Sequence, residues 1–340
     1  MPTIAVITDN TSDQINGVVT TYRNIAIQAH QDGYDVVMIA PDRFASWPAP
    51  GYPEVRLSWP RRLGGILADT NPDYVHIATE GTLGLAARLW LDRRGWRYNT
   101  SYHTRFPEFM SAIYGVPTAW TYRYLRWFHK HSGRVLTTTD TMVADLRYHG
   151  FEGEILAWTR GVDRDNLQPS QIWSHRHDYQ LKPRVLCVSR VSAEKNLDAL
   201  AELTPEFDVH LVGDGPYLAD LRRRVPGITY HGYLTGSALA DQYAQADVFV
   251  FPSRADTFGI VMIEAMSVGT PVAAYPVPGP QDVITPGITG VLDFELSRAV
   301  RQCLALDRDQ IRQHSQRWTW QACWQIFKQN LILARPRQSR

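Results

Sequence analysis

Residues 251–284 read FPSRADTFGIVMIEAMSVGTPVAAYPVPGPQDVI, and this stretch decides the fold. The apolar run AQADVFVF leads into it and predicts a buried strand that ends at Pro252. A helical pattern begins near Thr257, and residues 269–271 end it. The strand-like PVAAY comes next, so strand, loop, helix and strand follow one another. This order is typical of a βαβ unit in a doubly wound, mostly parallel sheet.

Two carboxylates lie at a fixed spacing in this stretch. Asp256 precedes the expected helix, and Glu264 follows eight residues later. Eight residues of continuous helix would turn the second acid about 80° away from the first, but with Asp256 on the loop both acids can face one side. Gly259, Ile260 and Val261 would present free N–H groups at the positive helix end, where a diphosphate is stabilised. Taken singly, each acid is better explained by helix capping or a surface salt bridge.

The whole segment, with its FPS entry, Phe-Gly helix start, EAM and G-T-P exit, resembles the E-x7-E region of retaining glycosyltransferases of family 4. The resemblance implies the GT-B fold, an α/β architecture of two Rossmann-like doubly wound domains facing a central cleft. Asp256 stands where that family usually has Glu and would contact the sugar. Glu264 would hold the nucleotide ribose. Phe258 and the three residues that follow it would bind the donor.

Composition favours a globular enzyme of two domains. A chain of 340 residues exceeds the size at which a single core usually stops growing. Basic and acidic residues nearly balance, 35 against 34, which argues against a nucleic-acid partner recruited by overall charge. The three cysteines form no C-x-x-C pair, so neither a disulfide framework nor a zinc site is expected. No targeting or membrane-spanning segment is predicted, and we expect a cytoplasmic protein with buried thiols, peripheral on the inner face of the cell membrane.

Alternating strand and helix patterns divide the chain into two halves. We expect an N-terminal, acceptor-binding Rossmann-like domain over residues 1–165 and a polar, aperiodic linker over 166–183. A second Rossmann-like domain, which would bind the nucleotide sugar, covers 184–317. Residues 318–340 would form a helix that packs back on the first domain, as in proteins of this resemblance.

Further donor-binding residues are expected at the ends of strands in the second half. Arg190 follows the strand RVLCVS, and Lys195 lies in the next loop; they match the Arg and Lys that bind the donor diphosphate in the family. Taken alone, Lys195 is better explained as a solvated loop lysine with an ordinary salt bridge. The LVGDGP turn resembles the family's G-x-G-P element at Gly213. The YHGYLTG loop resembles the one whose backbone borders the nucleotide base, and it contributes Gly232, Tyr233 and Leu234.

The first half supplies two more candidates. Gly17, in INGVV, resembles the family glycine that lets the backbone approach the diphosphate and the sugar. His103, in SYHTRFPEF, resembles the histidine that contacts the donor sugar. RGVD, ending at Asp163, resembles the loop that closes the first domain. A glycine or a histidine at such a position is otherwise more often structural.

The expected chemistry is transfer of a hexose-type sugar from a nucleotide diphosphate sugar to an acceptor hydroxyl. Catalytic roles fall to His103, Arg190, Lys195 and Asp256, because the leaving diphosphate needs positive charge and N–H dipoles. No D-x-D motif lies in a suitable loop, so no metal or other cofactor is expected. A UDP-sugar is the favoured donor, with GDP-mannose as the alternative. The resemblance, and not the residues, implies retention of configuration by front-face attack.

The acceptor prediction rests on residues 88–134, where nine basic residues stand against two acids. Twelve aromatic residues are interleaved with them, as on surfaces that settle on an anionic membrane. Arg123, Arg126 and Trp127 are the expected membrane or acceptor contacts, and a glycerolipid such as diacylglycerol is the expected acceptor. The competing explanation is that the aromatics fill a core while the arginines solvate helices.

Other functions stay open at this point. The acceptor could be a soluble sugar or a polysaccharide intermediate. A non-catalytic sugar-nucleotide-binding protein is less favoured, with Asp256 as its only support. A phosphorylase would need a pyridoxal lysine motif, which the few lysines do not provide.

Overall fold

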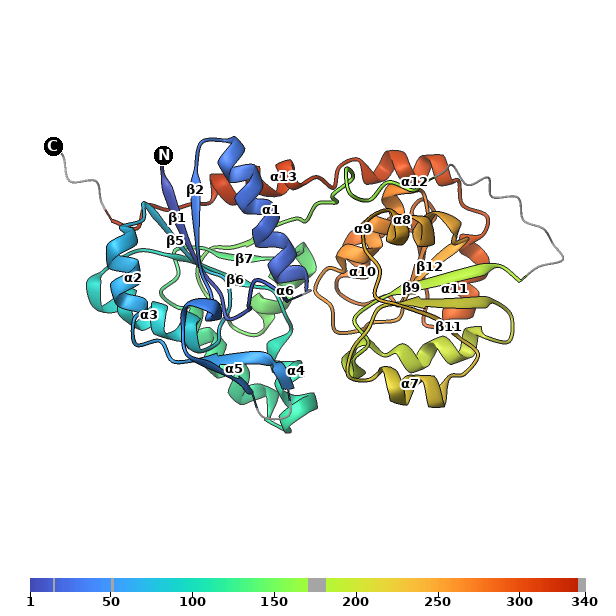
Figure 1. The fold of residues 1–340 in the computed structure, drawn as a ribbon, viewed down its shortest axis with the longest axis horizontal. Coiled ribbons are helices and arrows are strands. Elements are labelled where there is room, and N and C mark those ends of the chain that lie inside the picture. The colour runs from blue at the N-terminus through green and yellow to red at the C-terminus, as the bar shows by residue number, and fades with distance from the viewer. Residues whose placement is uncertain (15, 50–51, 171–181, 336–340) are drawn as a thin grey trace. The chain divides into compact units, whose positions relative to one another are not determined.

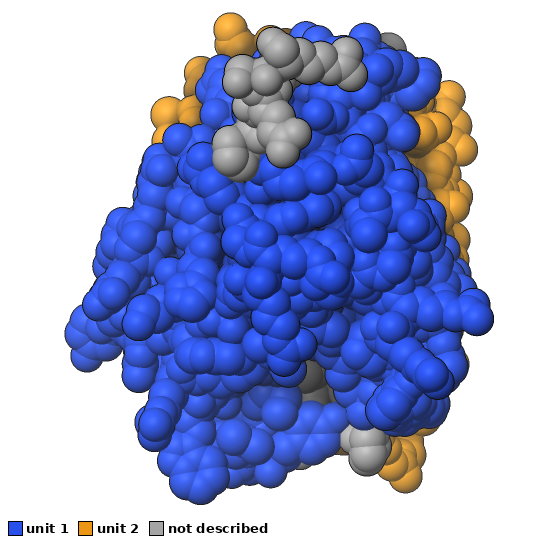
Figure 2. All heavy atoms as spheres, turned by 90° about the vertical axis from the view of Figure 1, so that its left-hand side faces the viewer, with its two compact units in different colours: residues 1–160, 320–340 blue, residues 161–319 orange. Residues whose placement is uncertain are grey.

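The computed structural model describes residues 1–14, 16–49, 52–170 and 182–335, and its chain forms two compact units. The first unit comprises residues 1–160 and 320–340, and the second comprises residues 161–319; they are coloured separately in Figure 2. The chain thus passes from the first unit to the second between Arg160 and Gly161, and returns between Thr319 and Trp320. Of the expected linker, residues 171–181 lie outside the described part. The expected α/β class with two Rossmann-like units is confirmed.

A parallel sheet of six strands forms the centre of the first unit, in the order β2, β1, β5, β6, β7, β8 (Figure 1). Its strands are β1 Thr3–Ile7, β2 Asp35–Ile39, β5 Tyr74–Ile77, β6 Asn99–Tyr102, β7 Val135–Thr137 and β8 Ile155–Ala157. The strands are short and almost entirely buried in the middle of the sheet, as parallel strands covered on both faces must be.

Helices follow the strands of this sheet as in βαβ units. They are α1 Gly17–Gln31, α2 Leu63–Thr70, α3 Thr82–Arg94, α4 Phe106–Tyr114, α5 Thr118–His129, α6 Asp140–Tyr148 and the short η1 Pro41–Arg43. One feature was not expected from the sequence. Strands β3 Ser46–Ala49 and β4 Tyr52–Ser58 pair antiparallel in a separate two-stranded sheet.

The second unit repeats the plan with a parallel sheet in the order β11, β10, β9, β12, β13, β14. Its strands are β9 Arg184–Val188, β10 Asp208–Val212, β11 Thr229–Gly232, β12 Val248–Phe251, β13 Val272–Ala274 and β14 Gly290–Leu292. The chain order therefore reverses direction between the neighbouring strands β9 and β12. In doubly wound sheets a ligand binds beyond the carboxyl ends of the strands at such a switch point.

The helices of the second unit are α7 Leu218–Arg224, α8 Gly236–Gln245, α9 Ile260–Ser267, α10 Pro280–Val283, α11 Leu296–Cys303 and α12 Arg308–Ser315. Two 3₁₀ helices, η2 Ala193–Lys195 and η3 Leu197–Leu203, follow β9. Helix α9 begins at Ile260, three residues later than the sequence pattern indicates, which lengthens the loop that carries Asp256.

The final helix, α13 Trp320–Gln329, belongs to the first unit and packs against α1. Its Trp324 indole donates to Asp32 over 2.8 Å, and the Trp158 indole donates to the carbonyl of Cys323 over 2.9 Å. The helix ends at Gln329, within the range 318–340 in which it was expected. In the described ranges, no helix combines the length and the apolar character needed to cross a bilayer.

Candidate active site

Lys195 and Asp256 meet at the switch point of the second sheet. Lys195 ends the 3₁₀ helix that follows β9, and Asp256 lies on the loop that follows β12. Lys195 Nζ donates to Asp256 Oδ1 over 2.6 Å, and about a quarter of each side chain is exposed, 24% and 23%. The two residues are 61 positions apart in sequence. Pairing of β9 with β12 therefore brings them together.

The electrostatics of Asp256 reflect this ion pair. Burial raises the pKa of the carboxyl, but the positive charge of Lys195 and the hydrogen bonds from Lys195 and Ser253 together outweigh burial and hold the pKa below its usual value. Asp256 is thus ionised at neutral pH. The loop is fixed from behind by Gly279, whose φ of +91° and close approach to the Asp256 carbonyl leave no room for a Cβ.

Arg190 lies two residues beyond the end of β9, half-buried, on the same edge of the sheet as Lys195. Its carbonyl accepts hydrogen bonds from the Ser189 hydroxyl over 2.8 Å and from the Ser192 N–H over 3.1 Å. These bonds fix the backbone from which the guanidinium extends. The position agrees with the predicted diphosphate role and leaves that role a prediction.

The start of α9 has the backbone geometry expected of an anion site. Gly259 is its N-cap residue, with φ +85°, and an added Cβ would press on Phe251 and Met262. Ile260 opens the helix. Phe258, by contrast, is only 4% exposed, and its ring packs edge-on against Trp318 with centroids 5.4 Å apart. Its side chain therefore belongs to the core, and only its backbone is available to a donor.

Glu264 lies inside α9, half-buried, and accepts a hydrogen bond from the buried Tyr243 hydroxyl over 2.8 Å. No basic residue of the described part forms an ion pair with it, so the surface salt bridge considered above is not present. Burial raises the pKa of Glu264 above its usual value, and the negative charge of Asp163 adds to the rise. A carboxylate without a counter-ion is suited to accept hydrogen bonds from ribose hydroxyls.

Two glycine turns border the same sheet edge. Gly213 follows β10 with φ +140°, and a Cβ there would overlap the Ser189 carbonyl, so only glycine fits. Its N–H donates to the Gly232 carbonyl over 2.8 Å. Beyond Gly232, the Tyr233 side chain is 51% exposed and Leu234 packs partly against the core. Tyr233 is thus the accessible side chain of this loop.

In the first unit, His103 is held by hydrogen bonds at both ring nitrogens. It directly follows β6. The Arg160 guanidinium donates to its Nδ1 over 2.9 Å, and the Tyr22 hydroxyl lies 2.9 Å from its Nε2. Because guanidinium cannot accept, Nδ1 is the acceptor, and the neutral ring carries its proton on Nε2. The Tyr22 oxygen also lies 2.8 Å from His76 Nε2.

This network keeps His103 neutral. Burial lowers the pKa of its ring well below the usual value, and the charges of Arg160 and His76 lower it further. Arg160 itself is 3% exposed and has no carboxylate partner among the described residues; it donates to the Trp158 carbonyl over 2.7 Å and lies over the Trp158 ring. The predicted sugar contact of His103 would share a nitrogen with this network.

Sequence reasoning missed Tyr22 and Arg160. Arg160 directly precedes the RGVD glycine, which was a usable signal, whereas Tyr22 lies in an ordinary helix pattern. Gly17, the other candidate in the first unit, is the exposed first residue of α1. The Asn16 side chain caps this helix by accepting from Val18 and Val19 over 3.0 and 2.9 Å.

The predicted acceptor region divides between core and surface. On α5, Tyr122 and Phe128 are buried, so the competing core explanation holds for them. Arg123 and Arg126 are exposed, as are Trp120 at 72% and Trp127 at 44%. One exposed stripe runs along α5 to its C-cap residue, with basic and aromatic residues three or four positions apart. Its members are Trp120, Arg123, Trp127 and Lys130. Part of the region is therefore a basic, aromatic surface.

Within the part of the chain that the structure describes, no three His, Cys, Asp or Glu side chains gather as metal ligands would. The three cysteines are buried and unbridged, and burial raises the pKa of each thiol to about 12. The charged residues at the switch point are instead a cation and its counter-ion.

The chain is similar to known glycosyltransferases over most of its length. A family model described as Glycosyl transferases group 1 matches residues 182–305, and one described as Glycosyltransferase Family 4 matches residues 15–166. The chain is 31% identical over 317 residues to a GDP-mannose-dependent alpha-mannosyltransferase of Mycobacterium tuberculosis, covering 85% of this chain and 83% of that protein. It is 25% identical to the alpha-monoglucosyldiacylglycerol synthase of Streptococcus pneumoniae, covering 90% and 79%.

Among solved structures, a sucrose-phosphate synthase of Thermosynechococcus elongatus superposes with a TM-score of 0.76 at 20% identity. The match covers 97% of this chain and 98% of that one. At this identity the likeness concerns the fold, and it extends over both units.

Proposed function

The chain belongs to glycosyltransferase family 4 and uses a nucleotide sugar, and from this premise we propose that it transfers mannose from GDP-mannose to a hydroxyl of a membrane glycerolipid, without a metal ion. The observation that carries the donor chemistry is the Lys195–Asp256 pair at the switch point. A cation is held there beside the start of α9, where an incoming diphosphate needs positive charge.

The residues of the second unit divide the work on the donor. Lys195 and Arg190 would neutralise the diphosphate as negative charge develops on it, and the backbone at Gly259 would add N–H dipoles. Glu264 would accept from the ribose hydroxyls. Asp256, ionised, orients Lys195 and would contact the sugar.

We propose front-face transfer with retention of configuration. The bond from the anomeric carbon to the phosphate oxygen breaks as the acceptor oxygen bonds to that carbon. The acceptor hydroxyl passes its proton to the departing phosphate, so no protein base is consumed. The proposed chemistry requires stabilisation of charge more than proton transfer by the protein. This agrees with a neutral His103 whose two ring nitrogens are both hydrogen-bonded.

GDP-mannose as donor is supported by the name of the mycobacterial relative, whereas the sequence alone favoured a UDP-sugar. The test is thermal unfolding with GDP-mannose, UDP-glucose and ADP-glucose at equal concentration, because a ligand that binds the folded state raises the melting temperature. GDP-mannose should give the largest rise. A rise with UDP-glucose and none with GDP-mannose would show that the donor is a UDP-sugar, as the sequence alone favoured.

Metal independence has a simple test. Transfer with an excess of chelator should equal transfer without it, because the cations of the protein serve the leaving group. Loss of activity with the chelator, and its recovery with magnesium or manganese, would show that the diphosphate needs an ion.

A glycerolipid acceptor is supported by the exposed basic and aromatic stripe of α5 and by the name of the pneumococcal relative. Anionic vesicles should bind the protein, and binding should fall as salt rises, because each basic residue near the surface contributes roughly 1 kcal/mol. Arg123→Glu with Arg126→Glu should weaken binding about tenfold or more. Arg23→Glu with Arg43→Glu is the control, since both are exposed arginines of the same unit.

The second candidate is a soluble sugar acceptor, which this measurement also addresses. Vesicle binding equal in the two double variants, or absent at low salt, would favour that candidate and leave the donor chemistry unchanged.

A further inference from the structure

Tyr243 joins two helices of the second unit at the carboxylate of Glu264. The tyrosine lies on α8 and is fully buried, and its hydroxyl donates to Glu264 Oε2 over 2.8 Å. Glu264 follows 21 positions later, on α9. A hydrogen bond to a carboxylate is charge-assisted and therefore strong. Tyr243 thus fixes one of the two oxygens with which Glu264 can accept a bond from a ligand.

The other oxygen of Glu264, Oε1, is available to a ligand. No group of the residues that the structure describes donates to it, and it is not buried. A carboxylate with one oxygen held by the protein and the other accessible presents one acceptor in a fixed position. Burial raises the pKa of Glu264, and the hydrogen bond from Tyr243 opposes that rise. Tyr243 therefore favours the ionised form, which accepts hydrogen bonds.

Tyr243 is itself held at its backbone and at its ring. Its carbonyl accepts from the Thr270 hydroxyl over 2.7 Å, and the oxygen of that hydroxyl accepts from the Arg308 guanidinium over 2.9 Å. The tyrosine ring packs on Phe249, with the ring centroids 5.6 Å apart. A side chain fixed at several points holds the group that it bonds in one geometry. Contacts from α8 and α12 thus determine where Glu264 can accept.

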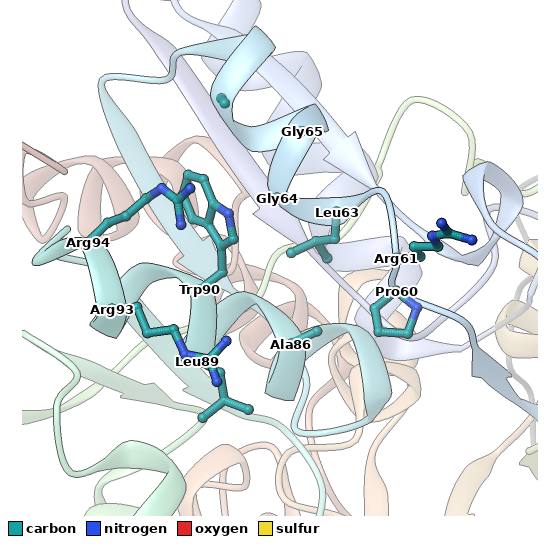
Figure 3. A pocket seen from close by; sticks show the side chains of 11 residues that line it. Pro60, Arg61, Leu63, Gly64, Gly65, Ala86, Leu89, Trp90, Arg93 and Arg94 are labelled. Atoms are coloured by element: carbon teal, nitrogen blue, oxygen red, sulfur yellow. The ribbon is translucent and has the colours of Figure 1, made fainter.

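A cavity in the first unit offers no comparable convergence of polar groups. It has a volume of about 510 Å³ and lies between α2 and α3, where the Trp90 indole packs on Gly64. Figure 3 shows the guanidinium groups of Arg61, Arg93 and Arg94 on different sides of this cavity. Cations that point apart do not share one anionic group. The polar groups that converge on a single ligand position are those at Glu264.

We propose that Tyr243 is a positioning residue that gives the donor site its preference for a ribonucleotide over a nucleotide without ribose hydroxyls. The inference rests on the proposed function, in which Glu264 accepts from the ribose. Tyr243 is buried and acts through Glu264: its hydroxyl holds Oε2, and Oε1 accepts from the ribose diol. Without that hydroxyl the carboxylate can rotate and is more easily protonated, so the preference for ribose is lost.

The test is calorimetry with GDP and with dideoxyGDP, which lacks both ribose hydroxyls. The unaltered protein should bind GDP about tenfold or more tightly than the analogue, because the analogue leaves the carboxylate without a donor. Tyr243→Phe should weaken GDP binding about tenfold and change dideoxyGDP binding less than about twofold, since only the ribose bond is lost. If UDP-glucose stabilises the protein more than GDP-mannose does, UDP and dideoxyUDP take the place of this pair.

Tyr98→Phe is the matched control. Tyr98 is also buried, and its hydroxyl also donates to a carboxylate, that of Asp92 over 2.9 Å, but in the first unit. The control loses the same kind of hydrogen bond and should keep the ratio of the two nucleotide affinities. A para-aminophenylalanine residue in place of Tyr243 keeps an N–H donor at this position. It should restore the preference for GDP, and it tests the inference even if Tyr243→Phe folds poorly.

Three results would overturn the inference. They are an unchanged affinity ratio in Tyr243→Phe, equal weakening of both nucleotides in that variant, and an equal loss of preference in Tyr98→Phe. The second would make the role of Tyr243 purely structural. Equal binding of GDP and dideoxyGDP by the unaltered protein is a different outcome, because it would contradict the ribose contact of Glu264 and with it the inference. The unaltered protein therefore distinguishes failure of the proposed function from failure of the role of Tyr243.

Discussion

The two units place a cation at the carboxyl edge of their sheets in opposite ways. In the second unit Lys195 faces Asp256, and both side chains keep about a quarter of their surface exposed. In the first unit Arg160 is buried and faces carbonyl oxygens, a neutral imidazole and the Trp158 ring. A partly exposed ion pair can rearrange around an incoming anion, whereas a buried cation without a counter-ion is costly and must be held by fixed dipoles.

The difference indicates different tasks. Burial lowers the pKa of Arg160, and its guanidinium donates a hydrogen bond that positions His103. Lys195 instead has a partner that a diphosphate can replace or share. We therefore expect Lys195 to bind the ligand, whereas Arg160 stabilises the arrangement of the protein itself.

Of the variants that test this difference between the units, Lys195→Ala is expected to change turnover most. Loss of one preorganised donor to a developing charge costs about 10²- to 10³-fold in turnover. Transfer with saturating donor is the measurement, and the melting temperature should stay close to that of the unaltered protein. Lys182→Ala is the control, because Lys182 lies in the same unit, is exposed and donates to the Thr204 carbonyl.

Near-normal turnover of Lys195→Ala would break the comparison. Lys195 would then be a structural counter-ion of Asp256, and the second unit would resemble the first in using its cation for positioning.

The difference between the units also explains what the sequence could predict. The candidates of the second unit lie in short motifs after strands, so the sequence alone named Lys195, Asp256 and Glu264, and the structure brings the first two together. The network of the first unit joins Tyr22, His103 and Arg160 from three distant segments. Only the packed sheet creates that proximity, and no local pattern reports it.

The fold shows the same limit. Apolar runs predicted the strands of both parallel sheets except β14, because buried strands have a strong signal and β14 is only three residues long. The β3–β4 pair was missed because Pro48 and Pro53 interrupt its strand pattern. Proline is tolerated on edge strands, and both strands of a two-stranded sheet are edges.

A medium effect is expected in the first unit, on stability as a function of pH. Burial lowers the pKa of His76 to about 3, below its ordinary value near 6.5. Above pH 6.5 both folded and unfolded chains hold this ring neutral; below it the unfolded chain takes up a proton and the folded one does not. The free energy of unfolding should therefore fall by about 1.4 kcal/mol per pH unit for this one ring as pH drops below 6.5.

Urea unfolding at pH 7.5, 6.5 and 5.5 measures this slope, and His76→Gln should remove its share. His131→Gln, at an exposed ring, is the control and should keep the slope. Equal slopes in the unaltered protein and in His76→Gln would mean that His76 titrates in the folded state, and that the buried network is looser than its distances indicate.

The smallest effect is expected for Asp256→Glu, which restores the acid usual in the family. The present pair is short, 2.6 Å from Lys195 Nζ to Oδ1, and one more methylene must be absorbed by a change of rotamer on a side chain that is partly exposed. Because the ion pair can form with either acid, transfer should change by less than about tenfold, well below the loss in Lys195→Ala. Asp256→Asn gives the contrast, since it keeps the shape and removes the charge that holds Lys195. If Asp256→Glu lost as much activity as Lys195→Ala, the exact position of the carboxylate against the sugar would matter more than its charge, and the second unit would depend on fixed geometry as fully as the first.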